Sequence, residues 1–114
     1  MVKTGLFTID ELYDLVNAEH SALKMEEAGY GRSGWYDFAP EDEYNDRIKS
    51  LGKHGNKFEK DLRNTAIVVS DSFDHLGNLY QGDFDTEKEF WEERNFVQEK
   101  IMEEIAYCMN TYIR

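Results

Sequence analysis

The chain has 114 residues, of which 40% are hydrophobic and 14% aromatic, with a single cysteine and a formal net charge of −11 at pH 7. This length suits one domain with one core, which we expect to span residues 1–114. The negative charge disfavours direct binding to DNA, RNA or anionic lipid, and it favours basic proteins or metal ions as partners. One cysteine excludes an internal disulfide, and no apolar run approaches the ~20 residues of a membrane span. We therefore expect a soluble protein of the cytoplasm.

The first predicted element is a helix from Thr8 to about Ala28. Thr8 and Glu11 have the three-residue spacing of a capping box, in which each side chain accepts a hydrogen bond from the other's backbone. Gly29 is a typical helix stop. The apolar residues that share one face of this helix are Ile9, Leu12, Val16 and Leu23. His20 lies on the flank of that face, where an isolated histidine is more typical of a hydrogen-bonded boundary residue than of a ligand.

A stretch rich in glycine and aromatic residues, 29–38, follows this helix. It contains G-x-G-x-x-G, but in dinucleotide-binding folds that pattern follows a strand and opens a helix. Here it follows a helix and leads into aromatic residues, so we reject a nucleotide site. The side chains of types enriched at protein-binding hot spots are Tyr30, Arg32, Trp35 and Tyr36. The alternative is that Trp35 and Phe38 cap the core.

Two further helices are predicted between residues 40 and 76. Pro40 fits the first turn of the earlier one, and Asn56 is placed to cap the later one. The later helix contains apolar residues at spacings of three and four, which are Phe58, Leu62, Ala66, Val69, Phe73 and Leu76. The run 66–69 is β-prone, so a hairpin that pairs 65–70 with 78–84 is the alternative.

The last predicted helix runs from Asp85 to Arg114, the longest stretch without glycine or proline. Thr86 and Glu89 have capping-box spacing at its start. Its core-facing stripe consists of Phe90, Val97, Ile101, Ile105, Cys108 and Tyr112. We therefore predict an all-α fold, a compact bundle of about four helices. An α+β fold with a small hairpin around 65–84 is the alternative.

The other side of this last helix is the main functional candidate. Its carboxylates are Glu89, Glu92, Glu93, Glu99 and Glu103. Phe96 and Tyr107 stand among them, eleven residues apart and so on nearly the same side of the helix. Carboxylates three or four residues apart repeat every ~5 to 6 Å along a helix, a spacing comparable to that of nucleic-acid backbone charges. The alternative is that the segment 30–38 covers both rings and leaves an ordinary solvated face.

Enzymatic chemistry has weaker support in the sequence. Carboxylates three residues apart can bind Mg²⁺ in helical nucleoside-triphosphate pyrophosphohydrolases. The four such pairs in this chain are Glu11 with Asp14, Glu43 with Asp46, Asp71 with Asp74, and Glu89 with Glu92. About five are expected by chance at this composition. No histidine has a second ligand at zinc spacing, and Cys108 on an apolar stripe should have a raised pKa. We expect no catalytic residue, cofactor or metal, and the pyrophosphohydrolase remains a third hypothesis.

In size, negative charge, aromatic content and lack of a catalytic motif, the chain resembles small acidic inhibitors that bacteriophages encode against host nucleases. These are the anti-restriction and anti-CRISPR proteins. The resemblance is one of general character and transfers no residue role. It implies a non-enzymatic inhibitor in the host cytoplasm that occupies the nucleic-acid site of a basic partner, such as a nuclease. The alternative is a small acidic interaction or regulatory subunit, which could form a homodimer.

Overall fold

The computed structural model describes residues 5–31, 34 and 43–114. Its α-helices are α1 (Ile9–Glu27), α2 (Glu43–Lys49), α3 (Gly55–Val68), α4 (Ser70–Gly77) and α5 (Glu87–Cys108). Short 3-10 turns form η2 (Gly52–His54), η3 (Gln81–Asp83) and η4 (Asn110–Tyr112). The predicted all-α bundle is confirmed. The hairpin alternative is wrong, because most of 65–77 is helical and 81–83 is a 3-10 turn.

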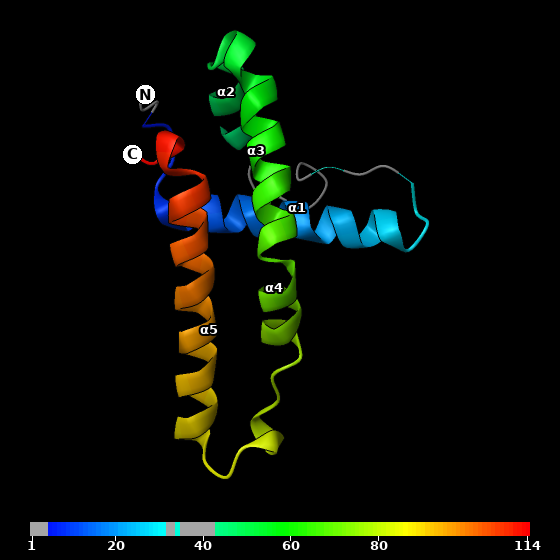
Figure 1. Ribbon diagram of the computed structural model, residues 1–114, viewed down its shortest axis with the longest axis vertical. Coiled ribbons are helices and arrows are strands. Elements are labelled where there is room, and N and C mark those ends of the chain that lie inside the picture. Colours follow the sequence, from blue (N-terminus) through cyan, green and yellow to red (C-terminus); the bar gives the residue numbers. More distant parts are fainter. Residues whose placement is uncertain (1–4, 32–33, 35–42) are drawn as a thin grey trace.

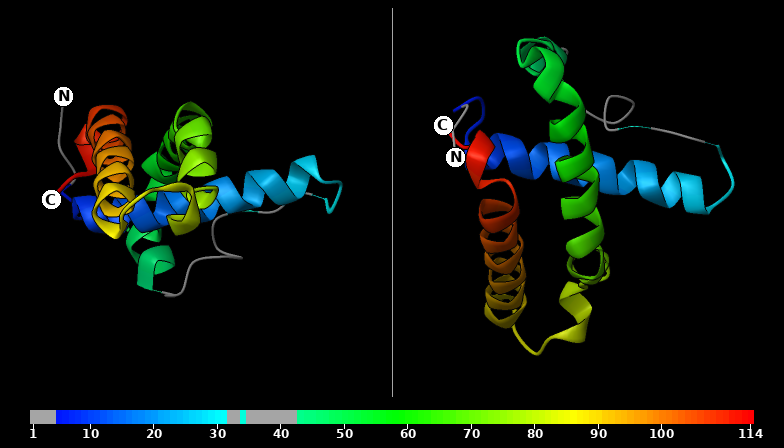
Figure 2. Two further views of the ribbon diagram at one scale, coloured as in Figure 1. Left: turned by 90° about the horizontal axis from the view of Figure 1, so that it is seen from below. Right: turned by 45° about the horizontal axis from the view of Figure 1, so that its top comes forward.

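The helices form two layers (Figure 1). α3 and α4 follow one another along one line, and α5 runs beside them in the opposite direction. α1 crosses this pair and contacts α3, α4 and α5, and Figure 2 shows that it lies across one side of the pair. The radius of gyration is 15.2 Å, against ~13 Å for a typical domain of this length. The molecule is long because α2 and the first half of α3 extend beyond α1 on one side, and α4 and the first half of α5 extend beyond it on the other.

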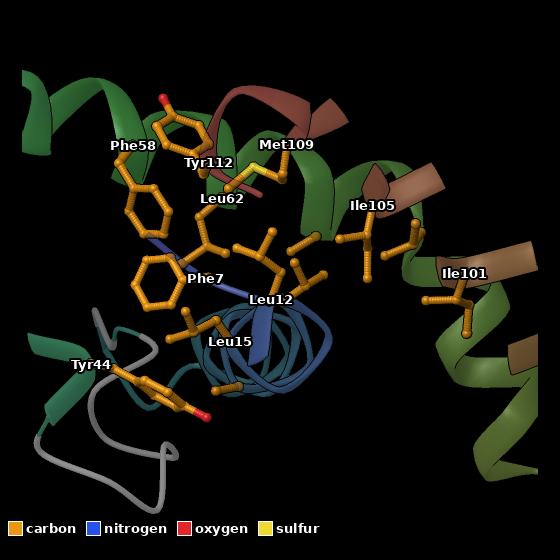
Figure 3. Close-up of a cluster of buried hydrophobic side chains, with 14 of the residues drawn as sticks. Phe7, Leu12, Leu15, Tyr44, Phe58, Leu62, Ile101, Ile105, Met109 and Tyr112 are labelled. Atoms are coloured by element: carbon orange, nitrogen blue, oxygen red, sulfur yellow. The ribbon is translucent and has the colours of Figure 1, made fainter. Parts of the chain in front are cut away.

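The core lies where α1 crosses the other helices (Figure 3). Phe7 is fully buried, stacks on Phe58 with ring centroids 5.4 Å apart, and meets Tyr44 edge-on at 5.9 Å. Phe58 in turn meets Tyr112 edge-on at 4.8 Å. The fully buried aliphatic side chains of the same core include Leu12, Leu15, Val16, Leu62, Ile101 and Ile105. Every predicted helix thus contributes its apolar face to one continuous core.

Residue 7 pairs with residues close to the end of the described chain. The Phe7 N–H donates to the Tyr112 carbonyl at 3.0 Å, and the Arg114 N–H donates to the Phe7 carbonyl at 2.6 Å. The predicted last helix was therefore too long, because α5 ends at Cys108 and η4 turns the chain toward Phe7. The chain leaves the helix here because Tyr112 packs on Phe58 and the backbone pairs with residue 7 instead of continuing the helix.

The predicted helix over 56–76 is divided in two at Val69. Its regularly spaced apolar residues from Phe58 to Phe73 are buried and Leu76 is partly buried. Val69 (φ −95°, ψ 5°) separates α3 from α4. The break follows Ile67 and Val68, and successive β-branched residues lose rotamer freedom in a helix. Asn56 was wrongly predicted as the cap, because α3 already begins at Gly55 and continues directly from η2.

The predicted capping box at the start of α1 is confirmed. The Glu11 N–H donates to Thr8 Oγ1 at 3.2 Å, and the Thr8 N–H donates to Glu11 Oε1 at 3.0 Å. At the start of α5, the Glu89 N–H likewise donates to Thr86 Oγ1 at 3.2 Å. Both helices therefore begin with a backbone N–H satisfied by a threonine side chain, as the sequence predicted.

We expect Thr8→Ala to lower the free energy of unfolding by about 1 kcal/mol, because the first turn of α1 loses a hydrogen-bond acceptor. Urea unfolding followed by circular dichroism measures this loss. The control is Asn17→Ala, an exposed substitution in the middle of α1 that should be neutral or slightly stabilising, since alanine is the better helix former. Equal losses in the two variants would contradict the role of the cap.

Candidate protein-binding face

The outward side of α5 carries a continuous row of exposed side chains. Residues three or four apart on a helix lie above one another. The row consists of Glu89, Glu92, Phe96, Glu99, Glu103 and Tyr107, and we call it the outer face of α5. The opposite side of the helix is buried through Val97, Ile101 and Ile105. Because α5 lies at one edge of the molecule (Figure 1), this face points away from the other helices.

The two aromatic residues of this face are exposed. Phe96 is 54% exposed and Tyr107 is 85% exposed. Tyr30, at the end of α1, is also exposed, and so does not cover them. The other candidates from the aromatic stretch, Arg32, Trp35 and Tyr36, lie outside the described residues, as does Phe38. The exposure of both rings favours the prediction of apolar anchors over that of a covered pair.

Glu93 was predicted on this face but turns toward α4. Its side chain is half-buried, and its Oε1 lies 3.4 Å from Nε2 of His75. One step of 100° along the helix separates it from Glu92, which is enough to move it from the outer face to the side that faces α4. Glu93 therefore belongs to the contact between α4 and α5, where it forms an ion pair whenever His75 is protonated.

Two lysines lie beside the outer face of α5. Lys88 Nζ is 3.8 Å from Glu92 Oε1, and Lys100 Nζ lies 4.8 Å from the centre of the Phe96 ring. Both are contacts between residues four apart on the helix, and exposed contacts of this kind contribute only a few tenths of a kcal/mol, about 0.2–0.5. The four carboxylates of the face outnumber these two lysines, so the face is negative overall.

In two of the acidic pairs considered for metal binding, one carboxylate binds a basic side chain. Arg47 of α2 binds the Glu11 carboxylate, and Lys24 Nζ lies 2.9 Å from Asp74 Oδ2. Among the described residues, no three His, Cys, Asp or Glu side chains lie close enough together to bind a metal ion. Cys108 is half-buried, and burial raises the pKa of its thiol, as the sequence predicted. No helix in the described ranges is long and apolar enough to cross a membrane.

Two open pockets lie away from the outer face of α5. The larger, of about 520 Å³, lies between α1 and α3 and is lined by Leu23, Glu26, Glu27, Arg63, Ile67 and Ser70. The smaller, of about 350 Å³, lies between α1 and α5 and is lined by Asp10, Tyr13, Asp14, Gln98 and Met102. In the larger pocket the Arg63 guanidinium is 3.4 Å from the Glu26 carboxylate. Two of its three charged side chains therefore bind each other, and Glu27 pairs with Lys24 at 3.8 Å.

A polar cluster between α1 and α4 was not indicated by any sequence pattern. His20, predicted as a boundary residue, is only 8% exposed, and its ring stacks on Phe73 of α4. Its Nε2 lies 3.3 Å from Asp74, which also binds Lys24. His20 and Lys24 of α1 are about fifty positions from Phe73 and Asp74 of α4 in the sequence, and no local pattern connects the two pairs. Only the crossing of α1 over α4 brings them together.

No protein-family model matches this chain, and no curated protein or solved structure matches it significantly.

Proposed function

We propose that this protein is a non-enzymatic inhibitor that places the outer face of α5 in the basic nucleic-acid-binding surface of a partner protein, such as a nuclease. The observation that supports this most directly is the exposure of Phe96 and Tyr107 within a row of carboxylates. Covering large apolar side chains with a partner is favourable, because it removes their apolar surface from water, and anchors of this type dominate protein interfaces.

The spacing of the carboxylates supports a partner that normally binds phosphates. With a rise of ~1.5 Å per residue, Glu92, Glu99 and Glu103 lie at intervals of ~10 and ~6 Å along one straight line. A basic groove that tracks a nucleic-acid backbone presents its lysines and arginines along such a line. The net charge of −11 also accelerates encounter with a basic surface and opposes association with a second copy of this chain.

The two kinds of residue contribute differently to such a complex. Exposed carboxylates act over distance, so they raise the association rate and lose their effect as salt screens them. Phe96 and Tyr107 lie about three helical turns apart and act only on contact. Their contribution therefore slows dissociation and depends little on salt.

The test compares two charge-matched variants as affinity baits. The face variant carries Glu92→Lys, Glu99→Lys and Glu103→Lys, and the control carries Asp10→Lys, Asp46→Lys and Glu59→Lys, all at exposed positions. Wild type and control should capture the same partner from a lysate at low salt, whereas the face variant should lose at least ~90% of it, since each close charge pair contributes substantially to binding. A short duplex oligonucleotide should displace the partner from wild type.

The anchors are tested with the captured partner. Phe96→Ala and Tyr107→Ala should each weaken binding by ~1–3 kcal/mol, with little dependence on salt. The proposal is wrong if the face variant and its control capture the partner equally, or if nucleic acid does not compete with wild type.

A further inference from the structure

The contact between α1 and α4 contains a buried histidine nitrogen without a well-formed hydrogen bond. The ring of His20 stacks on Phe73 with centroids 5.3 Å apart and planes inclined by 29°. Its Nε2 is fully buried and lies 3.3 Å from Asp74 Oδ1 without hydrogen-bond geometry. Unpartnered buried polar atoms are rare in native proteins, because leaving one unpaired costs free energy. His20 therefore lowers the stability of the folded state at this contact unless another interaction compensates for the unpaired nitrogen.

Burial, more than the charges around it, keeps the His20 ring neutral in the folded protein. Asp74 is the nearest anion, but its Oδ2 binds Lys24 Nζ at 2.9 Å. A proton on His20 would place a second cation close to Lys24 and against the Phe73 ring, away from water. The other charged group that acts on His20 is Glu27, at the end of α1. Burial is the largest effect, and it lowers the pKa of His20 below 6.5.

We propose that the contact of His20 with Phe73 and Asp74 is an acid-sensitive junction, in which protonation of His20 detaches α4 from α1. Phe73 holds α4 on α1 by lying between Tyr13, at 5.4 Å, and His20. A charged imidazole needs a well-formed hydrogen bond at Nε2, and Asp74, which lies at 3.3 Å without hydrogen-bond geometry and binds Lys24, does not supply one while the ring stays on Phe73. The break at Val69 lets α4 move without unwinding α3.

The direction of the pH dependence follows from the difference between the pKa of His20 in the folded protein and its pKa in the unfolded chain. In the unfolded chain His20 has an ordinary pKa near 6.5, whereas burial lowers its pKa in the folded protein. The unfolded or opened state therefore binds the proton more tightly. The stability contributed by neutral His20 is complete above about pH 6.5, and it is lost as the pH falls through the folded-state pKa. Asp74 stays charged in this window, because Lys24 lowers the pKa of its carboxyl below 3.8.

Amide hydrogen exchange at pH 7.5 and 5.5, corrected for the intrinsic rate, tests the proposal on the full chain. Acidification should reduce the protection of α4 at least several-fold, while amides of α5 near Ile101 and Ile105 keep theirs. In His20→Gln, which cannot titrate, α4 should show no such change. His54→Gln removes an exposed histidine in η2 and should behave as wild type.

Lys24→Met provides a second test that leaves His20 in place. Without the competing cation, Asp74 stabilises a proton on His20, so the titration midpoint of the His20 ring in NMR spectra should rise. The acid response of α4 should then shrink. The proposal is overturned if the wild-type ring titrates at or above pH 6.5, or if α4 and α5 lose protection together. It is equally overturned if His20→Gln retains the acid response.

Discussion

Replacing Phe7 by alanine is expected to lower the free energy of unfolding by about 3–5 kcal/mol. The ring is fully buried and contacts Phe58 and Tyr44, which belong to α3 and α2. Its removal leaves a cavity that those two rings cannot fill without abandoning their own contacts. The substitution also removes the side chain that packs next to the backbone hydrogen bonds of residue 7 with residues 112 and 114. Urea unfolding followed by circular dichroism measures the loss.

The matched control for this prediction is Phe96→Ala, which makes the same chemical change at a half-exposed ring on the outer face of α5. It should change the free energy of unfolding by less than about 1 kcal/mol, because an exposed ring buries little apolar area. A comparable loss in both variants would show that Phe96 is packed in solution. That result would also remove the anchor from the proposed interface.

Ile105→Ala is expected to lower the free energy of unfolding by about 2–5 kcal/mol. Ile105 is fully buried on the core side of α5, next along its stripe to Ile101. The control is Ile67→Ala in α3, where the isoleucine is 55% exposed. There the lost burial is small and alanine is the better helix former, so the change should stay within about 0.5 kcal/mol. Thermal or urea unfolding of the two variants side by side distinguishes them.

An Ile67→Ala variant as unstable as Ile105→Ala would contradict this account. It would mean that something covers the apolar residues of α3 beside the larger pocket. Ile67 lines that pocket together with Leu23, so the control also measures how much burial the pocket provides.

The local features of the fold could be predicted from the sequence because they depend on near neighbours. The cap at Thr8 needs only Glu11, and the buried row from Phe58 to Phe73 is visible as a spacing of three and four. Two features could not be predicted. The break at Val69 depends on a balance between rotamer entropy and burial. The end of α5 at Cys108 depends on Phe7, which lies at the other end of the sequence.

The candidate face could be predicted in part for the same reason. Its carboxylates and rings follow from helical periodicity, but their exposure depends on which segments cover α5. Glu93 is an example. It lies one residue after Glu92 on the helix, but its side chain turns toward His75 of α4 instead of the outer face of α5. The His20 junction lay beyond sequence reasoning altogether, because α1 and α4 meet only in the folded chain.

The backbone pairing of residue 7 with residues 112 and 114 brings the start of the first helix next to the end of the last one. The segment just before α1 is joined to the segment just after α5 by two backbone hydrogen bonds. A circular permutant, opened in the exposed η3 and joined from 114 to 5 by a short linker, would keep every helix beside its present neighbours. The new N-terminus would lie just before the first turn of α5. The acidic face could then be fused directly to another protein without disturbing the core.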